Sequence, residues 1–142
     1  MTSASPHIVE AGGIVFNILS TPDGDILSAD IVSVTSPSIR EALTIFDGKN
    51  LLVCASPFRE AVWRELINTC YGERISYSEL AHRVGCPKAV RAVASAVAAN
   101  RIALAIPCHR IVRADGSTGQ FRWGDNVKRL LLESETSLKH DI

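Results

Sequence analysis

Hydrophobic and polar residues alternate in two short stretches near the start of the chain, which predicts two β-strands. These stretches are residues 14–19 and 26–34, and the turn-forming sequence Thr21-Pro22-Asp23-Gly24 lies between them. Ser38-x-x-Glu41 is a capping box that precedes apolar residues at helical spacing. Residues 1–11 are expected to be a loose tail. This part of the chain is therefore predicted to form a hairpin and one helix, which are too small to be stable alone.

Apolar residues recur at helical spacing in four later segments. Proline at the first position, a second capping box and terminal glycines mark their ends. The predicted helices span residues 57–72, 76–84, 87–99 and 125–135. The second and third are short and are joined by a tight turn at Gly85, which is the pattern of a helix-turn-helix.

The composition is that of a globular protein with a packed core. The chain has 142 residues, of which 46% are hydrophobic and 21% charged, enough for one domain or for one full domain with a small addition. We expect an α+β fold with two regions. Residues 1–52 would form a reduced α/β region, a small β-hairpin plus helix, which packs on residues 53–142. That second region would be mostly helical and winged-helix-like, and would contain the helix-turn-helix.

Charge is unevenly distributed although the formal net charge is zero. Residues 1–50 are acidic, whereas no acid lies between Glu79 and Asp115. The basic residues in that window are Arg83, Lys88, Arg91, Arg101, Arg110 and Arg113. An acid-free basic run favours a polyanionic partner, and a solvated basic face is the alternative.

The chain shows no signal peptide, no apolar run long enough for a membrane span and no CxxC pair. We therefore expect a soluble intracellular protein with reduced thiols, no membrane partner and no metal site. Cys54 and Cys70 are expected to be small buried residues, and Cys86 to be partly exposed.

A candidate nucleophile lies in the segment Ile106-Pro107-Cys108-His109-Arg110-Ile111-Val112. The thiolate is the reactive form of cysteine, and a neighbouring histidine can take the thiol proton directly or through water. Proline fixes the backbone just before the sulfur. Arg110 is expected to be a structural hydrogen-bond donor.

The predicted helix that precedes this segment, Lys88–Ala99, consists almost entirely of small residues with Arg91 among them. Such a helix can pack closely against another helix. Alternatively, its smooth surface lets the backbone approach a DNA groove while the arginine projects into it, as in minor-groove binding proteins.

The residues from about Ser56 to Glu135 resemble the O6-alkylguanine-DNA alkyltransferases, also called methylated-DNA–protein-cysteine methyltransferases. Pro107-Cys108-His109-Arg110 with Ile111-Val112 is similar to the family's active-site signature. The other matching segments are Ser56-Pro57-Phe58, Ala61-Val62-Trp63, Tyr71-Gly72, Ser76-Tyr77, Leu80-Ala81, Pro87–Val93 and Asn100.

The resemblance implies a DNA repair protein that acts once per molecule. Such proteins bind duplex DNA in the minor groove through the helix-turn-helix and flip the damaged guanine out of the stack. They transfer its O6-alkyl group to their own cysteine without a cofactor or metal. A monomer that binds double-stranded DNA containing O6-alkylguanine is expected, in the nucleus of a eukaryote or the cytoplasm of a prokaryote. Cooperative assembly on DNA stays open.

The resemblance also assigns roles near the cysteine. Cys108 would be the nucleophile and alkyl acceptor, and His109 its base. Glu135 would orient and charge-balance His109. A solvated surface glutamate is the alternative for Glu135, and Glu133 is a nearby competitor. Tyr77 would donate a proton or hydrogen bond to guanine N3 as negative charge builds on the leaving base.

Two further sets of residues follow from the same resemblance. Arg91 would fill the position left by the flipped base, and Asn100 would connect the recognition helix to the active-site loop. The DNA-binding set is Lys88, Arg91, Ala92, Ser95 and Asn100. The substrate-pocket set is Pro107, Val112, Phe121, Arg122 and Trp123.

Departures from the family pattern modify these expectations. Arg101-Ile102-Ala103 stands where the family usually places proline, so the turn into the active site is expected to be built differently. Phe121 replaces a common tyrosine and lacks its hydroxyl. The bulk of Arg122-Trp123 predicts a narrow pocket that prefers methyl over benzyl groups.

Three other functions compete with repair. Alkyltransferase-like proteins recognise the lesion without transfer, but they replace the cysteine that this chain keeps at position 108. A helix-turn-helix transcriptional regulator needs a polar, base-reading recognition helix. A Cys–His hydrolase or acyltransferase needs an oxyanion hole and leaves the helix-turn-helix unexplained.

Overall fold

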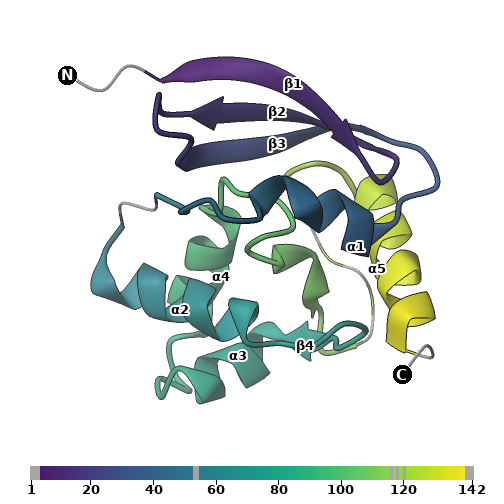
Figure 1. The fold of residues 1–142 in the computed structure, drawn as a ribbon. Helices are drawn as coiled ribbons and strands as arrows, with labels where there is room; N and C mark the ends of the chain where they lie inside the picture. Colours follow the sequence, from purple (N-terminus) through teal and green to yellow (C-terminus); the bar gives the residue numbers. More distant parts are fainter. Residues whose placement is uncertain (1–3, 53–54, 116, 118, 120, 140–142) are drawn as a thin grey trace.

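A three-stranded sheet covers one side of a helical part in the computed structural model, which describes residues 4–52, 55–115, 117, 119 and 121–139 (Figure 1). The strands are β1 (Ser5–Ala11), β2 (Ile14–Ser20) and β3 (Ile26–Val34). All neighbours are antiparallel, in the order β1-β2-β3. The predicted hairpin of β2 and β3 is therefore confirmed, with a third strand added at its edge.

The first strand corrects the expectation that residues 1–11 form a loose tail. β1 pairs with β2 along its whole length although most of its side chains are exposed. Its burial pattern therefore shows little of the alternation that identifies a strand. The signal in the sequence is the two-residue turn Gly12-Gly13, where both residues have positive φ angles of 57° and 75°. Such a pair is typical of a tight hairpin turn.

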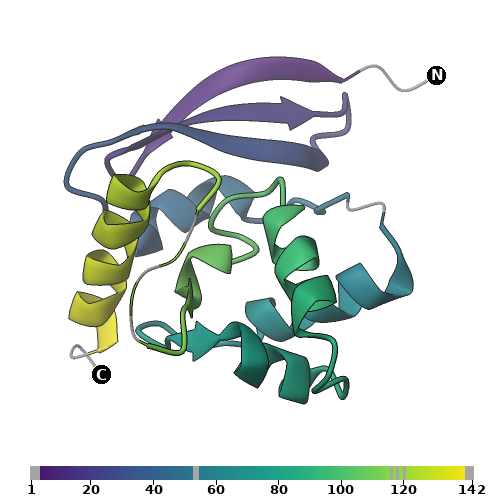
Figure 2. The same cartoon turned by 180° about the vertical axis from the view of Figure 1, so that it is seen from behind.

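The predicted first helix is divided into two short pieces. α1 (Ile39–Ala42) is α-helical and η1 (Leu43–Phe46) continues it as a 3₁₀ turn. Ser38 is the N-cap residue, but its side chain makes no capping hydrogen bond. Both views place α1 beside the sheet (Figures 1 and 2). The ring of Phe46 in η1 meets that of Phe16 in β2 edge to face.

Four longer helices build the rest of the fold and confirm its α+β class. They are α2 (Pro57–Ile67), α3 (Tyr77–Arg83), α4 (Val90–Ala98) and α5 (Asp125–Lys139). The Oγ atoms of Ser56 and Ser76 accept the backbone N–H groups of Arg59 and Glu79, as N-caps do. None of the helices in the described residues is long and apolar enough to cross a membrane.

The helix-turn-helix consists of α3, a turn and α4. α4 begins later than expected, because Pro87 and Lys88 lie in the turn that precedes it. Val93, Ala96 and Val97 bury one side of α4. Trp63 of α2 is buried against this helix and donates a hydrogen bond to the Ala96 carbonyl at 2.8 Å. The recognition helix is therefore held from behind by α2.

One hydrophobic core joins the sheet to the helical part. It contains Phe16 and Ile18 from the sheet together with Leu66, Leu80 and Leu131 from three helices. Each of these side chains is at most 2% exposed. The continuity of this core explains how a small sheet and its helix are stabilised although neither could fold alone.

Two short backbone pairings bring distant segments together. β4 (Ile75–Ser76) lies parallel to β5 (Ile111–Val112). On the other side of the molecule, Ala29 of β3 forms a parallel bridge with Ile102. In Figure 2 the chain that follows α4 rises to the sheet and descends again toward β5. These pairings hold the segment of residues 100–112 from both ends.

Candidate active site

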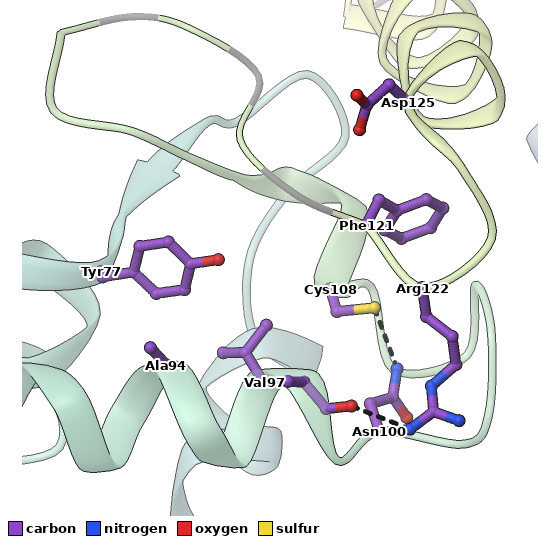
Figure 3. Close-up of a pocket in the computed structure, with 9 residues that line it drawn as sticks. Tyr77, Ala94, Val97, Asn100, Cys108, Phe121, Arg122 and Asp125 are labelled. Carbon is purple, nitrogen blue, oxygen red and sulfur yellow. Dashed lines mark hydrogen bonds between the residues drawn. The ribbon is translucent and has the colours of Figure 1, made fainter.

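A cavity of about 530 Å³ opens between α3, α4 and the segment that carries Cys108 (Figure 3). This is the size range of small-molecule pockets. It is lined by Tyr77, Ala94, Val97, Ala98, Asn100, Cys108, Phe121, Arg122 and Asp125. The candidate nucleophile thus lies at the wall of a cavity formed partly by the recognition helix.

Tyr77 and Cys108 meet in this cavity because of the pairing between β4 and β5. Tyr77 is the first residue of α3, directly after β4, and Cys108 begins the 3₁₀ turn η2 (Cys108–Arg110) that leads into β5. In Figure 3 the Tyr77 hydroxyl points toward the space beside Cys108. Burial and the nearby Cys108 sulfur raise the pKa of the Tyr77 phenol above its ordinary value of 10.0. Tyr77 therefore remains a hydrogen-bond donor at neutral pH.

The Cys108 thiol is only 6% exposed. Burial raises its pKa to about 11, against a hydrogen bond from Asn100 and the positive charges of Lys128 and Arg122. At pH 7 only about one molecule in 10⁴ carries the thiolate at such a pKa. The sulfur therefore needs a base before it can act as a nucleophile.

Asn100 is buried directly after α4 and connects that helix to the cysteine. Its amide nitrogen lies 3.1 Å from Cys108 Sγ, 3.0 Å from the Ile106 carbonyl and 3.3 Å from the Ile102 carbonyl. Its amide oxygen accepts the Ile102 N–H at 2.9 Å. The expected connection between recognition helix and active-site loop is present as these four contacts.

The turn after Asn100 is built by the sheet. The N–H of Ala29 donates to the Arg101 carbonyl, and the N–H of Ala103 donates to the Ala29 carbonyl, both at 2.9 Å. Proline has no backbone N–H, so a proline at position 103 could not make the second bond. Leu104 follows with a φ of 68°, a left-handed conformation that is uncommon for leucine.

His109 is paired with Glu135 behind the cysteine. His109 Nε2 lies 2.6 Å from Glu135 Oε2, and both side chains are almost fully buried. A carboxylate can only accept, so Nε2 carries a hydrogen, and in the neutral imidazole Nδ1 is then the acceptor. Within the described part of the chain, His109 Nδ1 is buried and has no hydrogen-bond partner. The competing Glu133 is exposed and faces Arg129 instead.

Arg110 completes a buried charge network with the same carboxylate. Arg110 Nε lies 2.9 Å from Glu135 Oε1, and Arg110 Nη1 donates to the carbonyl and hydroxyl of Thr69. Burial alone would raise the pKa of Glu135, but hydrogen bonds and charges from His109 and Arg110 outweigh it and hold the pKa below 4.5. Arg110 is thus the structural donor that was expected, and Glu135 stays ionised at neutral pH.

The predicted DNA-binding residues divide into two groups. Arg91, Ala92 and Ser95 are exposed on α4, and Lys88 is exposed in the turn before it. Asn100, by contrast, is only 2% exposed and belongs to the interior of the site. The exposed surface of α4 combines small side chains with one arginine. This surface leaves room for a close approach of another backbone.

Only two of the five predicted pocket residues line the cavity. Phe121 and Arg122 line the cavity, and Arg122 Nη2 donates to the Ala98 carbonyl at the end of α4. Pro107, Val112 and Trp123 are not among the lining residues. Trp123 instead directs its indole N–H to the Asp30 carboxylate on β3, at 3.0 Å.

Lys128 is a candidate functional residue that sequence reasoning missed. It is only 1% exposed, and its Nζ lies 5.9 Å from the centre of the Phe121 ring. Burial lowers its pKa, whereas the Cys108 sulfur acts to raise it. The sequence indicated that Lys128 is buried, because it lies three residues before the apolar Leu131 and therefore on the same face of α5.

Neither Cys70 nor Cys86 lines the cavity. Cys70 and Cys86 are exposed and reduced, so the expectation of a buried Cys70 is wrong; it follows α2 in the turn that precedes β4. Cys54 lies outside the described residues. Among the described side chains, no group of three or more His, Cys, Asp or Glu residues could hold a metal ion.

Comparison with known proteins identifies the class of this chain. The family described as 6-O-methylguanine DNA methyltransferase, DNA binding domain, matches residues 57–137. This match covers more than half of the chain and includes the helix-turn-helix, Cys108 and Glu135. The chain therefore belongs to the 6-O-methylguanine DNA methyltransferase family.

Individual relatives agree with the family match. The bifunctional transcriptional activator/DNA repair enzyme Ada of Escherichia coli is 53% identical over 78 residues, which are 55% of this chain and 22% of Ada. A methylated-DNA–protein-cysteine methyltransferase of Mycobacterium bovis is 39% identical over 82% of this chain and 70% of its own length. The chain thus spans about a fifth of Ada and over two thirds of the mycobacterial relative.

The fold has a counterpart among solved structures. Mycobacterium tuberculosis OGT, crystallised in complex with DNA, superposes with a TM-score of 0.76 at 28% sequence identity. The likeness covers 92% of this chain and 91% of that chain. It therefore extends into the region before residue 57, which the family match does not reach.

Proposed function

We propose that this protein repairs DNA by transferring the O6-alkyl group of guanine to its own Cys108. The observation that carries the proposal is the position of the Cys108 sulfur. It lies at the wall of a cavity of about 530 Å³ beside the recognition helix, and the next residue, His109, is paired with the Glu135 carboxylate. Membership of the methyltransferase family supports the same reaction.

The DNA would be held by the helix-turn-helix. The exposed small residues Ala92 and Ser95 allow α4 to approach the minor groove, where Arg91 would enter the stack in place of the flipped guanine. Lys88 would contact phosphate from the preceding turn. Because Ala94 and Ala98 of the same helix line the cavity, a base leaving the stack beside α4 has a short path to Cys108.

The nucleophile would be generated by His109. The Cys108 thiol is protonated at neutral pH because burial raises its pKa to about 11. Its proton would pass to Nδ1 of His109, directly or through one water, and Glu135 would stabilise the resulting imidazolium. The thiolate then attacks the alkyl carbon on O6. A carbon–sulfur bond forms, the carbon–oxygen bond breaks, and the electron pair moves to the guanine.

Tyr77 would assist the departure of guanine. Its phenol faces the cavity and is kept protonated by its raised pKa. It would donate to guanine N3 as negative charge develops on the purine. The products are repaired guanine and an S-alkyl cysteine. A thioether is chemically stable, so each protein molecule would react once.

The cavity wall would set the size of the alkyl group. Phe121 and Arg122 close the side of the cavity near Cys108, and Arg122 is held to the end of α4. Pro107 and Val112 would act through the backbone around the cysteine. We expect methyl groups to be transferred faster than benzyl groups, and robust reaction with O6-benzylguanine would contradict this expectation.

The test is the mass of the intact protein after incubation with a duplex oligonucleotide that contains O6-methylguanine. We expect a gain of one methyl group, mapped to Cys108 and absent from Cys108→Ala. Unchanged mass with retained binding to the lesion would favour lesion recognition without transfer. Repeated turnover would exclude the single-use mechanism. Such a protein would act as a monomer in the compartment that contains the DNA, and sedimentation on DNA would reveal cooperative assembly.

A further inference from the structure

The loop of residues 121–123 is fastened at two points on opposite sides. Arg122 donates to the Ala98 carbonyl at the end of α4, at 2.9 Å. Trp123 donates to the Asp30 carboxylate on β3, at 3.0 Å and 93 positions earlier in the chain. The loop therefore bridges the recognition helix and the N-terminal sheet, and Asp30 is its anchor on the sheet.

The same short part of β3 also holds the other wall of the site. Ala29 exchanges backbone hydrogen bonds with Arg101 and Ala103, in the segment that leads from Asn100 to Cys108. Adjacent residues of one strand thus contact both chain segments that frame the cavity. A β-strand in a paired sheet is a rigid support, so the distance between these segments is set by β3.

The effect of Asp30 reaches the cavity through two rings. The Trp123 indole packs edge to face on Phe121, with ring centres 5.2 Å apart and an angle of 67°. Phe121 lines the same cavity as Cys108 (Figure 3). The Asp30 bond fixes the indole, and the indole limits where the Phe121 ring can lie. A hydrogen bond to a carboxylate is stronger than one between neutral groups.

We propose that Asp30 is a positioning residue that sets the width of the alkyl pocket, although it does not line that pocket. It acts through Trp123 and Phe121 and keeps the cavity narrow, which favours small alkyl groups. This inference rests on the proposed alkyl transfer and deepens it. It makes the N-terminal sheet a determinant of substrate size, whereas every reacting group lies in the helical part.

The experiment compares the rates of transfer from O6-methylguanine and O6-benzylguanine in the same duplex, measured by intact-protein mass. The variants are Asp30→Ala, which removes the acceptor, Asp30→Asn, which keeps an acceptor oxygen, and Trp123→Phe, which removes the donor. Asp25→Ala is the matched control, since Asp25 accepts a side-chain amide from Asn50 outside the site. Thermal unfolding of each variant confirms that it is folded.

We expect the methyl-to-benzyl rate ratio to fall about five- to tenfold in Asp30→Ala and in Trp123→Phe, the change that loss of one hydrogen bond produces. Their double variant should fall no further than the single variants. Asp30→Asn should retain most of the wild-type methyl-to-benzyl rate ratio, and Asp25→Ala should leave that ratio unchanged. Equal ratios in folded wild type and Asp30→Ala would overturn the inference while leaving the transfer reaction intact.

A second readout needs no DNA. Cys108 is labelled with a small and with a bulky thiol reagent, and the modified peptide is quantified so that the exposed Cys70 and Cys86 are counted separately. Asp30→Ala should raise the share of bulky labelling at Cys108, and Asp25→Ala should not. If the wild type transfers no methyl group, the proposed function fails, and this labelling still decides whether Asp30 sets the pocket width. Unchanged labelling in Asp30→Ala would refute the inference.

Discussion

The sheet of residues 5–34 and the helical part of residues 57–139 support the same site by different means. In the helical part, buried polar side chains hold one another, with the Glu135 carboxylate between His109 and Arg110. The sheet contributes backbone hydrogen bonds from Ala29 and one partly buried carboxylate, Asp30. One region would supply the reacting groups of the proposed transfer, and the other supports the walls of the cavity.

The two kinds of support respond differently to change. Removing one member of a buried charge network leaves its partners unpaired in a medium of low dielectric constant, which costs about 3–5 kcal/mol. Losing a single hydrogen bond at the edge of a sheet costs about 1 kcal/mol. The helical part is therefore expected to tolerate few substitutions without loss of chemistry. The sheet can be altered in ways that change selectivity and leave the reaction in place.

The largest expected effect is the pH dependence of Cys108 in the helical part. Its pKa of about 11 predicts that labelling by iodoacetamide rises about tenfold per pH unit from neutral pH and levels near pH 11. The unfolded chain releases this proton first, near pH 9, so the raised pKa also lowers the stability of the folded state between about pH 9 and 11. Peptide mapping after labelling checks the first effect. A plateau below pH 9 would contradict the burial argument.

The next effect tests the charge network directly. Glu135→Gln keeps the size of the side chain but leaves Arg110 buried without its counter-charge. We expect the free energy of unfolding to fall by about 3–5 kcal/mol, measured in urea, together with a loss of transfer activity.

Glu133→Gln is the matched control for that substitution on the same helix. Glu133 is exposed and its partner Arg129 is exposed as well. Its substitution should change stability by less than about 0.5 kcal/mol. Equal losses of unfolding free energy in Glu135→Gln and Glu133→Gln would show that burial does not increase the contribution of the charge network to stability.

A smaller effect separates chemistry from folding within the helical part. Tyr77→Phe removes only the hydroxyl that faces the cavity. We expect methyl transfer to slow by about 10²–10³-fold, the usual cost of one donor to developing negative charge, with stability and DNA affinity unchanged. Single-turnover kinetics measure the rate. Tyr71→Phe is the control, because the Tyr71 ring that stacks on Arg110 is retained. A rate loss of the same size in both variants would remove Tyr77 from the reaction.

The smallest expected effect concerns the connection that leaves the sheet after β3. Ser36, in the connection between β3 and α1, is exposed and has a φ of 47°. Glycine adopts this left-handed conformation without steric cost, so Ser36→Gly should change the free energy of unfolding by less than about 1 kcal/mol. Transfer should be unchanged. A marked loss of transfer would show that the sheet does more than support the walls.

Local signals in the sequence predicted most of the helices correctly. The side chains of Ser56 and Ser76 cap α2 and α3 as their motifs indicate, because a cap depends only on neighbouring residues. The helix start predicted at Pro87 was wrong, because Pro87 lies in a turn and α4 begins at Val90. β1 was missed because its exposed side chains do not alternate between buried and solvated positions.

Less of the candidate site could be predicted from the sequence, because contacts between residues far apart in the chain form it. Cys108 and His109 are neighbours and could be found from the residues alone. Tyr77 and Glu135 entered through the family resemblance. The structure shows why they meet Cys108 and His109: two-residue strands pair in parallel, and α5 packs behind η2. Asp30 carries no local signal of comparable strength, since its partner Trp123 lies 93 positions further along the chain.

The buried state of Cys108 has a consequence for the resting protein. A protein that reacts once is also consumed by any side reaction of its sulfur. Oxidation to sulfenic acid proceeds through the thiolate. A thiol with a pKa of about 11 is almost entirely protonated at neutral pH, so it resists oxidants while it waits. In the proposed reaction, the burial that would oblige the site to recruit a base would also protect the unused molecule from oxidation.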